Sequence, residues 1–231
     1  MDANGTNQVQ LTDTLFVCEK SPKWSPDGKR ILYRICMDDN RVADIWVINA
    51  DGSNPHVLVS QINAEHFDWS PDGEWIVYED NKQWTNPTGH YRDIYKARSD
   101  GSGYLTRLTP SDDYCEHTPL WSSTGIILFR SDVENVENKS YSSTWVMRSD
   151  GSDKRMVNPW GGKWHDFSPS GEWIVFQTCH PPTTASAQLF IMRNPLYGRA
   201  VQTLMPVGIL ALLALLSLIA AISIVRKRKG N

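Results

Sequence analysis

Three of the six histidines in this chain stand near recurring turns and could be imagined to bind a metal ion together. His66, His117 and His165 precede the serine of such a turn by four, five and three residues. Imidazole is a common metal ligand, but a ring of ligands built from repeats should keep one register. We therefore expect these three side chains to pack between repeats and assign no metal ligand. The remaining histidines are expected in loops: His56, His90 and His180.

Aspartates recur in the turns and could be read as calcium ligands. The aspartates in question are Asp27, Asp51, Asp72, Asp100 and Asp150. An aspartate hydrogen-bonds the backbone of its own turn, which explains each position without a metal. Thr124 and Ser170 replace this aspartate in two equivalent turns, as a scaffold position allows. Because a Gly-x-Ser-x-Gly nucleophile elbow is also missing, we predict no catalytic, cofactor-binding or metal-binding residue.

The turns that hold these residues belong to a repeated unit. A Ser-Pro-Asp-Gly-like turn is followed each time by a strand with β-branched and aromatic residues. Successive turn glycines are 45, 52 and 46 residues apart. The predicted structural turn residues of this motif are Ser25, Pro26, Asp27, Gly28, Ser70, Pro71, Asp72, Gly73, Ser122, Gly125, Ser168, Pro169 and Gly171.

A second turn motif follows within each period. It is an Asp-Gly hairpin turn at Asp51-Gly52, Asp100-Gly101 and Asp150-Gly151. Each repeat is therefore predicted to form four short strands, which is the number in one propeller blade. We predict an all-β propeller of about four blades, either a closed or an incomplete ring, followed by one C-terminal transmembrane helix. The predicted blades span about 13–60, 61–110, 111–158 and 159–204.

The first residues match the end of a blade. Residues 1–12 align with the last turn and outer strand of a repeat, so the chain is expected to begin inside a blade. One interpretation is that it is the C-terminal part of a longer protein. The alternative is that Val9–Thr12 closes the ring by joining another blade.

The C-terminal region has the composition of a membrane anchor. Val207–Val225 contains no charged residue in 19 positions, which is long enough to cross a bilayer. We predict a transmembrane helix over 206–225 and a basic cytoplasmic tail over 226–231, which places the propeller outside the cytoplasm. The competing topology is a tail anchor with a cytosolic propeller. Without that tail the body has 19 basic and 26 acidic residues, which argues against a nucleic-acid partner.

Long polar segments join the second and third strands of three predicted blades. These are Asn81–Tyr91, Asp132–Ser143 and Cys179–Ala187. Loops gathered on one rim of a propeller are expected to carry recognition. Cys18 and Cys36 flank one hairpin, and whether they form a disulfide is left open.

Together the motifs resemble the WD40-like propeller repeat of the TolB type, over residues 1–204. The resemblance implies an extracytoplasmic propeller that binds other proteins. We therefore predict a membrane-anchored, non-catalytic module that binds a protein or glycan partner on its loop-bearing rim. The alternatives are a carbohydrate-active or hydrolytic propeller with an axial metal or acid site, and a non-functional fragment of a longer TolB-like protein.

Overall fold

The computed structural model divides into two compact units, Met1–Tyr197 and Gly198–Asn231. It describes residues 6–14, 17–36, 43–62, 64–81, 92–103, 105–110, 114–134, 140–159, 161–178 and 188–198. Among them is no helix of the length and apolar character that a membrane crossing requires. The predicted membrane segment, the basic tail and residues 199–204 of the last predicted blade lie outside the described residues.

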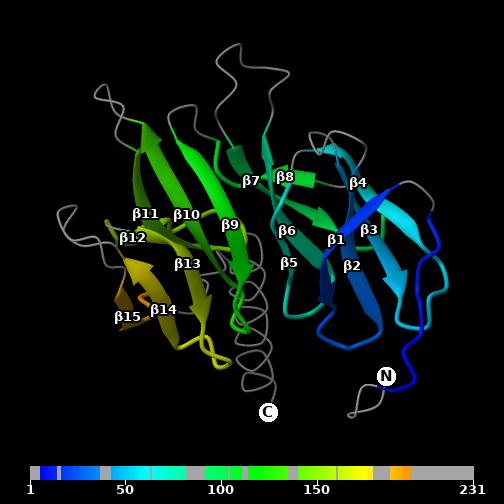
Figure 1. Ribbon diagram of the computed structural model, residues 1–231. Helices are drawn as coiled ribbons and strands as arrows, with labels where there is room; N and C mark the ends of the chain where they lie inside the picture. The colour runs from blue at the N-terminus through cyan, green and yellow to red at the C-terminus, as the bar shows by residue number, and fades with distance from the viewer. Residues whose placement is uncertain are drawn as a thin grey trace, which may run out of the picture. The chain divides into compact units, whose positions relative to one another are not determined.

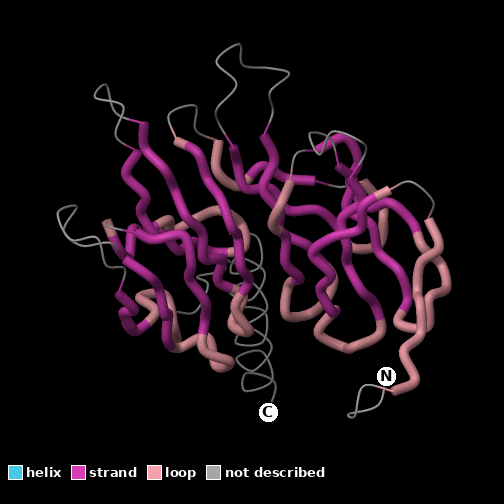
Figure 2. Tube along the Cα trace, viewed as in Figure 1, coloured by secondary structure: helices cyan, strands magenta, loops and turns pink. Residues whose placement is uncertain are grey.

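The first unit is built from antiparallel sheets, which confirms the predicted all-β class. The strands of the first two sheets are β1 (Cys18–Trp24), β2 (Arg30–Cys36), β3 (Ala43–Asn49), β4 (His56–Ile62), β5 (Phe67–Trp69), β6 (Trp75–Asn81), β7 (Arg92–Arg98) and β8 (Leu105–Arg107). The third sheet holds β9 (Cys115–Trp121), β10 (Ile126–Glu134), β11 (Ser140–Arg148) and β12 (Arg155–Asn158), and the fourth holds β13 (Gly161–Phe167), β14 (Trp173–Thr178) and β15 (Gln188–Arg193). Figures 1 and 2 show the sheets following one another in chain order.

Local hydrogen bonds explain why the first turn motif recurs. Asp27 accepts a bond from Ser25 Oγ at 2.6 Å, and Ser25 Oγ accepts one from the backbone N–H of Arg30 at 2.9 Å. Gly28 has φ of +68°, a conformation that disfavours other residues. The Ser25 hydroxyl and the Lys29 N–H lower the pKa of Asp27. These turn residues therefore stabilise their own hairpin.

Equivalent turns without an aspartate use a hydroxyl in its place. Ser122 Oγ lies 3.0 Å from Thr124 Oγ1, and Ser168 Oγ lies 3.1 Å from Ser170 Oγ. The hydroxyls of Ser122 and Ser168 also accept the backbone N–H that closes each hairpin. The turn needs only a short oxygen-bearing side chain at this position, which explains the variation in sequence.

The second strand of each sheet sends alternate side chains to opposite neighbours. Leu32 packs with residues of the second sheet, Val77 with residues of the third, and Leu128 with residues of the fourth. All three have no exposed surface. The intervening positions contribute to the clusters shared with the preceding sheet: Ile76, Tyr78, Ile127, Phe129, Ile174 and Phe176. Because both faces are apolar, each sheet needs a neighbour on each side.

Two cation-bearing side chains add hydrogen bonds between sheets. Arg30 donates from Nη2 to Gly73 O at 2.8 Å, and its guanidinium lies 4.7 Å from the ring centroid of Trp69. Lys96 donates from Nζ to Ser149 O at 2.8 Å across the next junction. In both cases a side chain of one sheet binds a backbone carbonyl next to a turn of the following sheet, so the turns also fix how neighbouring sheets meet.

Two loop predictions need correction. β10 extends to Glu134 and β11 begins at Ser140, so the predicted loop Asp132–Ser143 is shorter, because the pairing of the two strands continues to Glu134 and Ser140. His56, expected in a loop, begins β4. The predicted loop residues 82–91, 135–139 and 179–187 lie outside the described part of the chain.

We predict that Gly151→Ala destabilises the protein more than Gly101→Ala. Both glycines follow the aspartate of the same turn motif and have positive φ, so both substitutions introduce backbone strain. A Cβ at Gly151 would lie 2.9 Å from Leu108 O in the preceding sheet, whereas at Gly101 the closest atom is a His56 ring carbon at 3.8 Å. We expect a loss of about 1 kcal/mol for Gly101→Ala and of about 2–3 kcal/mol for Gly151→Ala, measured by urea unfolding. Equal losses of unfolding free energy would show that the close approach to Leu108 O does not contribute to the effect of Gly151→Ala.

Candidate functional site

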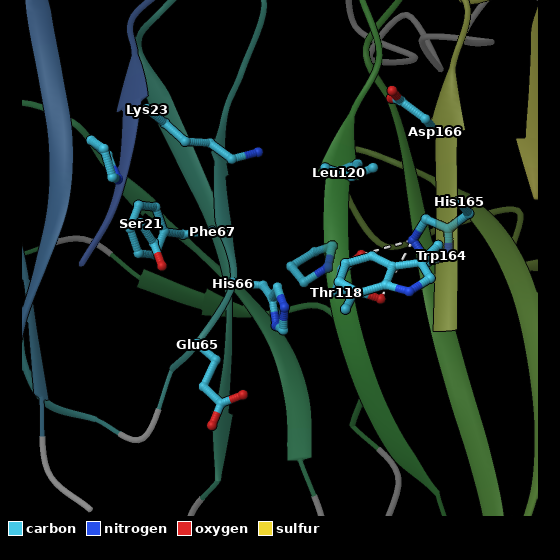
Figure 3. Close-up of a pocket in the computed structure, with 12 residues that line it drawn as sticks. Ser21, Lys23, Glu65, His66, Phe67, Thr118, Leu120, Trp164, His165 and Asp166 are labelled. Carbon is cyan, nitrogen blue, oxygen red and sulfur yellow. Dashed lines mark hydrogen bonds between the residues drawn. The ribbon is translucent and has the colours of Figure 1, made fainter. Parts of the chain in front are cut away.

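A cavity of about 420 Å³ lies where the first strands of the four sheets come together. We call it the central cavity. Figure 3 shows side chains from each of these strands, or from the residues just before them, facing it. Its lining residues are Ser21, Pro22, Lys23, Glu65, His66, Phe67, Thr118, Pro119, Leu120, Trp164, His165 and Asp166.

Bulges in the first strands shape the cavity wall. The pairing of β1 with β2 is irregular between Lys20 and Lys23, and Ser21 there has φ of +55°. The pairing of β9 with β10 is irregular beside Thr118, which has φ of +50°. A bulge adds a residue and turns the local backbone. Both bulges place a proline in the wall directly after the residue with positive φ.

The buried carboxylate of Glu79 stands behind the cavity and is the centre of a hydrogen-bonded cluster. Its Oε1 accepts hydrogen bonds from His66 Nδ1 at 3.0 Å and from Arg92 Nη1 at 2.9 Å. Its Oε2 accepts the backbone N–H of Thr118 at 2.7 Å and lies 4.0 Å from His117 Nδ1. The cluster joins two strands of the second sheet to the innermost strand of the third.

The donors around Glu79 decide its charge state. Burial alone would raise the pKa of Glu79, but the His66 hydrogen bond and the His66 and Arg92 charges hold it below its usual value. Burial lowers the pKa of His117, which the negative charge of Glu79 only partly opposes. Glu79 is therefore ionised at neutral pH and balanced by Arg92.

A second buried carboxyl shows what happens without such donors. Glu116 is 1 % exposed, and its Oε2 has no hydrogen-bond partner among the described residues. Burial and the negative charge of Asp93 raise the pKa of Glu116 to about 8. Glu116 does not line the central cavity, so its proton is not placed to serve chemistry there.

His165 lies on the opposite wall of the cavity from His66 (Figure 3). Its Nε2 lies 2.9 Å from Thr118 O, to which the neutral ring donates. Burial lowers the pKa of His165 to about 4, so the ring is neutral at pH 7. Its Nδ1 is buried and has no hydrogen-bond partner within the described part of the chain.

Asp68 connects three sheets near the cavity. Its Oδ1 accepts a hydrogen bond from Lys23 Nζ in β1 at 3.1 Å, and its Oδ2 accepts the backbone N–H of Trp121 in β9 at 2.8 Å. The indole Nε1 of Trp69 donates to Lys23 O at 3.2 Å. The charged side chains of Asp68 and Lys23 thus form hydrogen bonds that join neighbouring sheets.

The structure explains why the histidine spacing was misleading. His66 stands opposite Glu79, and His117 pairs with Arg130, the equivalent position of the third sheet. The two histidines therefore share one register, and the bulge in β9 accounts for the extra residue before the turn. His165 stands one position further along its strand, opposite Phe176. Sequence reasoning missed Glu79, whose signal was an acidic residue directly after an apolar run.

Among the residues that the structure describes, the group that comes closest to forming a metal site does not fit a metal ion. Glu65, His66 and Glu79 offer ligand atoms that all lie within 4.8 Å of one another. However, Arg92 Nη1 and His66 Nδ1 both bind Glu79 Oε1, and a cation there would lie beside the Arg92 guanidinium.

The predicted turn residues lie elsewhere. Pro26, Pro71 and Ser122 border a second hollow of about 310 Å³, together with Trp24, Asp68, Trp69, Trp121 and Ser123. Cys18 and Cys36 are paired in register across β1 and β2, and both are free thiols. His90, His180 and Cys179 are outside the described residues.

Comparisons with known proteins agree on the fold. No family model matches the chain. An uncharacterised protein of Agrobacterium fabrum is 26% identical over 167 residues, which are 68% of this chain and 54% of that protein. TolB of Anaeromyxobacter dehalogenans is 31% identical over 117 residues, which are 51% of this chain and 24% of that protein. The chain thus spans about half or less of the length of these relatives.

Solved structures with similar folds are propellers of several kinds. A protein of Agrobacterium tumefaciens assigned to TolB has a TM-score of 0.52 at 20% identity, with 77% of each chain covered. The propeller domain of the trilobed protease of Pyrococcus furiosus, described with an open velcro topology, has a TM-score of 0.58 at 14% identity, covering 77% of this chain and 56% of that one. An oligogalacturonate lyase in complex with manganese has a TM-score of 0.54 at 18% identity, covering 77% and 49%. At these identities the likeness establishes the fold alone.

We predict that Glu79→Gln destabilises the protein by about 3–5 kcal/mol at pH 7, because the substitution leaves Arg92 without its buried partner. The pKa of Glu79 is lowered on folding, so its contribution is fully present above its unfolded pKa and is lost as the pH falls through its folded pKa. The difference between wild type and variant should therefore shrink on acidification from pH 7 to about pH 3.5. Urea unfolding at both pH values measures it.

Glu74→Gln is the matched control. Glu74 forms an exposed ion pair with Arg98 at 2.9 Å, which contributes less than about 1 kcal/mol. A loss for Glu79→Gln as small as that for Glu74→Gln would show that the buried cluster does not hold the second and third sheets together.

Proposed function

We propose that this TolB-like β-propeller is a non-catalytic interaction module that binds a segment of a partner protein in its central cavity. The observation that carries the proposal is the cavity itself, which combines an apolar wall with a few polar groups. Such a composition is typical of binding sites. The name of one relative, TolB, supports a protein as the partner.

The cavity wall provides the kind of contacts that peptides use. Trp164 is 68% exposed, so its indole is accessible to a ligand. Pro22, Pro119 and Leu120 add rigid apolar surface. Exposed tryptophans are frequent hot spots of protein interfaces. A volume of about 420 Å³ accommodates a short protruding segment, with Glu65 and Asp166 as polar groups at the wall.

The titratable groups around the cavity favour binding over catalysis. The Glu79 carboxylate is held by donors from His66, Arg92 and Thr118. The neutral His165 uses its Nε2–H on Thr118 O. A general base needs a free lone pair within reach of the substrate proton, and Glu79 has none directed at the cavity.

A carbohydrate-active or hydrolytic propeller is the second candidate. It is favoured by the exposed carboxylate of Glu65 beside His66, and by the accessible ring of Trp164, on which a sugar could stack. This candidate differs from the first in a measurable way, because an enzyme would cleave its ligand. A non-functional fragment, the third alternative, would bind nothing.

We further propose that the chain is anchored in a membrane by Val207–Val225, with the propeller outside the cytoplasm. The support is the uncharged stretch of 19 residues and the basic residues that follow it. The predicted recognition loops would add binding surface outside the central cavity. A protein or a glycan could contact these loops.

The binding proposal is tested with a phage-displayed peptide library and a glycan array. We expect the wild-type chain to enrich peptides and to release them uncleaved, because the cavity offers apolar anchoring and the Glu79 carboxylate is occupied by its own donors. Trp164→Ala should weaken the binding of an enriched peptide roughly tenfold or more, measured by isothermal titration calorimetry. Tyr114→Ala, which removes a partly exposed ring that does not line the cavity, serves as the control.

Three results would contradict the binding proposal. Exclusive binding of glycans would point to a carbohydrate-binding module, and cleavage of a bound peptide or sugar would point to an enzyme. Equal affinity of the Trp164→Ala and wild-type chains would move the binding site away from the cavity.

The membrane proposal predicts that Leu216→Arg weakens membrane attachment. An arginine at the centre of a membrane helix costs about 2.5–3.5 kcal/mol, which shifts insertion toward the soluble fraction. Carbonate extraction of membranes from cells that express each chain measures the shift. The control is Leu216→Ile, which keeps the segment apolar. If wild type is itself extracted by carbonate, the segment is not an anchor.

A further inference from the structure

Two cysteines of the first sheet stand directly opposite each other on neighbouring strands. Cys18 begins β1 and Cys36 ends β2, and the two are partners in the antiparallel register of these strands. Both are free thiols. Partners in an antiparallel pair have Cα atoms about 4.5–5.5 Å apart, and a disulfide accepts a span of about 4.4–6.8 Å. The hairpin backbone therefore holds the two residues at a separation that suits a disulfide bond.

The two side chains also lie on the same face of the sheet. Side chains of directly paired residues project to one side, because the pleats of the two strands are aligned. Cys36 is an even number of residues from Leu32 along β2, so it shares the face that packs against the second sheet. The partner of Cys36 on β3 is Ala43. In this row of side chains, Cys18 is the thiol in register with Cys36.

The two thiols differ in their access to solvent. Cys18 is exposed, whereas Cys36 is 2% exposed. An oxidant in solution can therefore reach the sulfur of Cys18 directly, and Cys36 is shielded from it. Because Cys36 lies beside Cys18, it can react with a group that has become attached to the Cys18 sulfur. This order of access favours an internal bond over a lasting adduct.

The third sheet shows what is particular to this pair. Cys115 begins β9 as Cys18 begins β1, but its partner in register on β10 is Asp132. Burial raises the pKa of the Cys115 thiol to about 11, so its sulfur is protonated at neutral pH. The thiolate is the reactive form of cysteine. Cys115 therefore has no thiol in register and a less reactive sulfur, which makes it a control within the same chain.

We propose that Cys18 and Cys36 form a disulfide bond when the chain meets a disulfide oxidant, such as oxidised glutathione. The thiolate of Cys18 attacks one sulfur of the oxidant, whose S–S bond breaks and releases one thiol. The Cys36 thiol then loses its proton, and its sulfur attacks Cys18 Sγ and releases the second thiol. The two protein thiols give up two electrons and two protons, which the two sulfurs of the oxidant take up.

The bond ties down an edge strand that helps to form the central cavity. β1 is the outermost strand of the first sheet on one side, and its pairing with β2 is irregular between Lys20 and Lys23. Ser21 and Pro22 of this bulge line the cavity. The turn after β1 fixes the strand on one side of the bulge, and the disulfide fixes it on the other. In the proposed location outside the cytoplasm, such bonds form and persist.

Peptide mapping of the full chain tests the proposal. The chain is purified in mild detergent with a reductant, transferred to oxidised glutathione, treated with iodoacetamide and digested with trypsin. Lys20 and Arg34 lie between the two cysteines, so trypsin places them in separate peptides. A disulfide then appears as a linked pair of peptides that a reductant separates. We expect this link in most of the protein, with Cys115 alkylated.

Thermal unfolding measures the effect of the bond. A disulfide between Cys18 and Cys36 restricts the unfolded chain, so oxidation should raise the Tm of the wild-type chain by roughly 5–10 °C. Cys18→Ser changes an exposed side chain and should abolish both the link and the rise in Tm. The control Cys115→Ala also removes one thiol and should retain both.

The proposal fails on any of three results. Alkylation of both Cys18 and Cys36 after treatment with the oxidant would show that the pair does not react. Glutathione that stays attached to Cys18 would show that the Cys36 sulfur does not reach it. A link from either residue to Cys115 or Cys179 would assign the oxidation to a different pair.

Discussion

The packing of one sheet on the next is the interaction on which this structure depends. The second sheet, for example, is apolar on both faces, so alone it would leave Val77 on one side and Tyr78 on the other in contact with water. The hydrophobic effect makes the sheets stable only as a series. Arg30 and Lys96 then fix the spacing of the series by binding backbone carbonyls of the following sheet.

The centre of the molecule poses a different problem, because the buried carboxylate of Glu79 lies close to the first strands. The burial of Glu79 is stabilised by charged and backbone donors. Glu116, which lacks a donor at one oxygen, has a raised pKa instead. Donors, and not burial alone, therefore decide which carboxyl groups carry charge. The cavity lined by Trp164 and Leu120 lies beside these hydrogen-bonded groups.

The similar solved structures share the fold of this chain but differ from one another in activity. The similar structures include a protein assigned to TolB, a protease domain and a lyase, so one propeller architecture accompanies unrelated functions. The function of this chain must therefore be argued from its own side chains. In the central cavity these side chains form contacts between sheets, which supports binding more than catalysis.

The repeated turns determined the architecture from the sequence alone. Ser25, Asp27 and Gly28 make hydrogen bonds within a few residues, and local bonds of this kind are readable from spacing. The central cluster was not readable, because Glu79 meets Thr118 and His117 across two sheets, and a bulge in β9 shifts the histidine spacing by one residue. The exposure of Ile191 was equally hidden, since the equivalent Val47 and Val146 are buried in the first and third sheets. Sequence patterns record which face of a strand is apolar, whereas only the tertiary structure decides whether another sheet covers it.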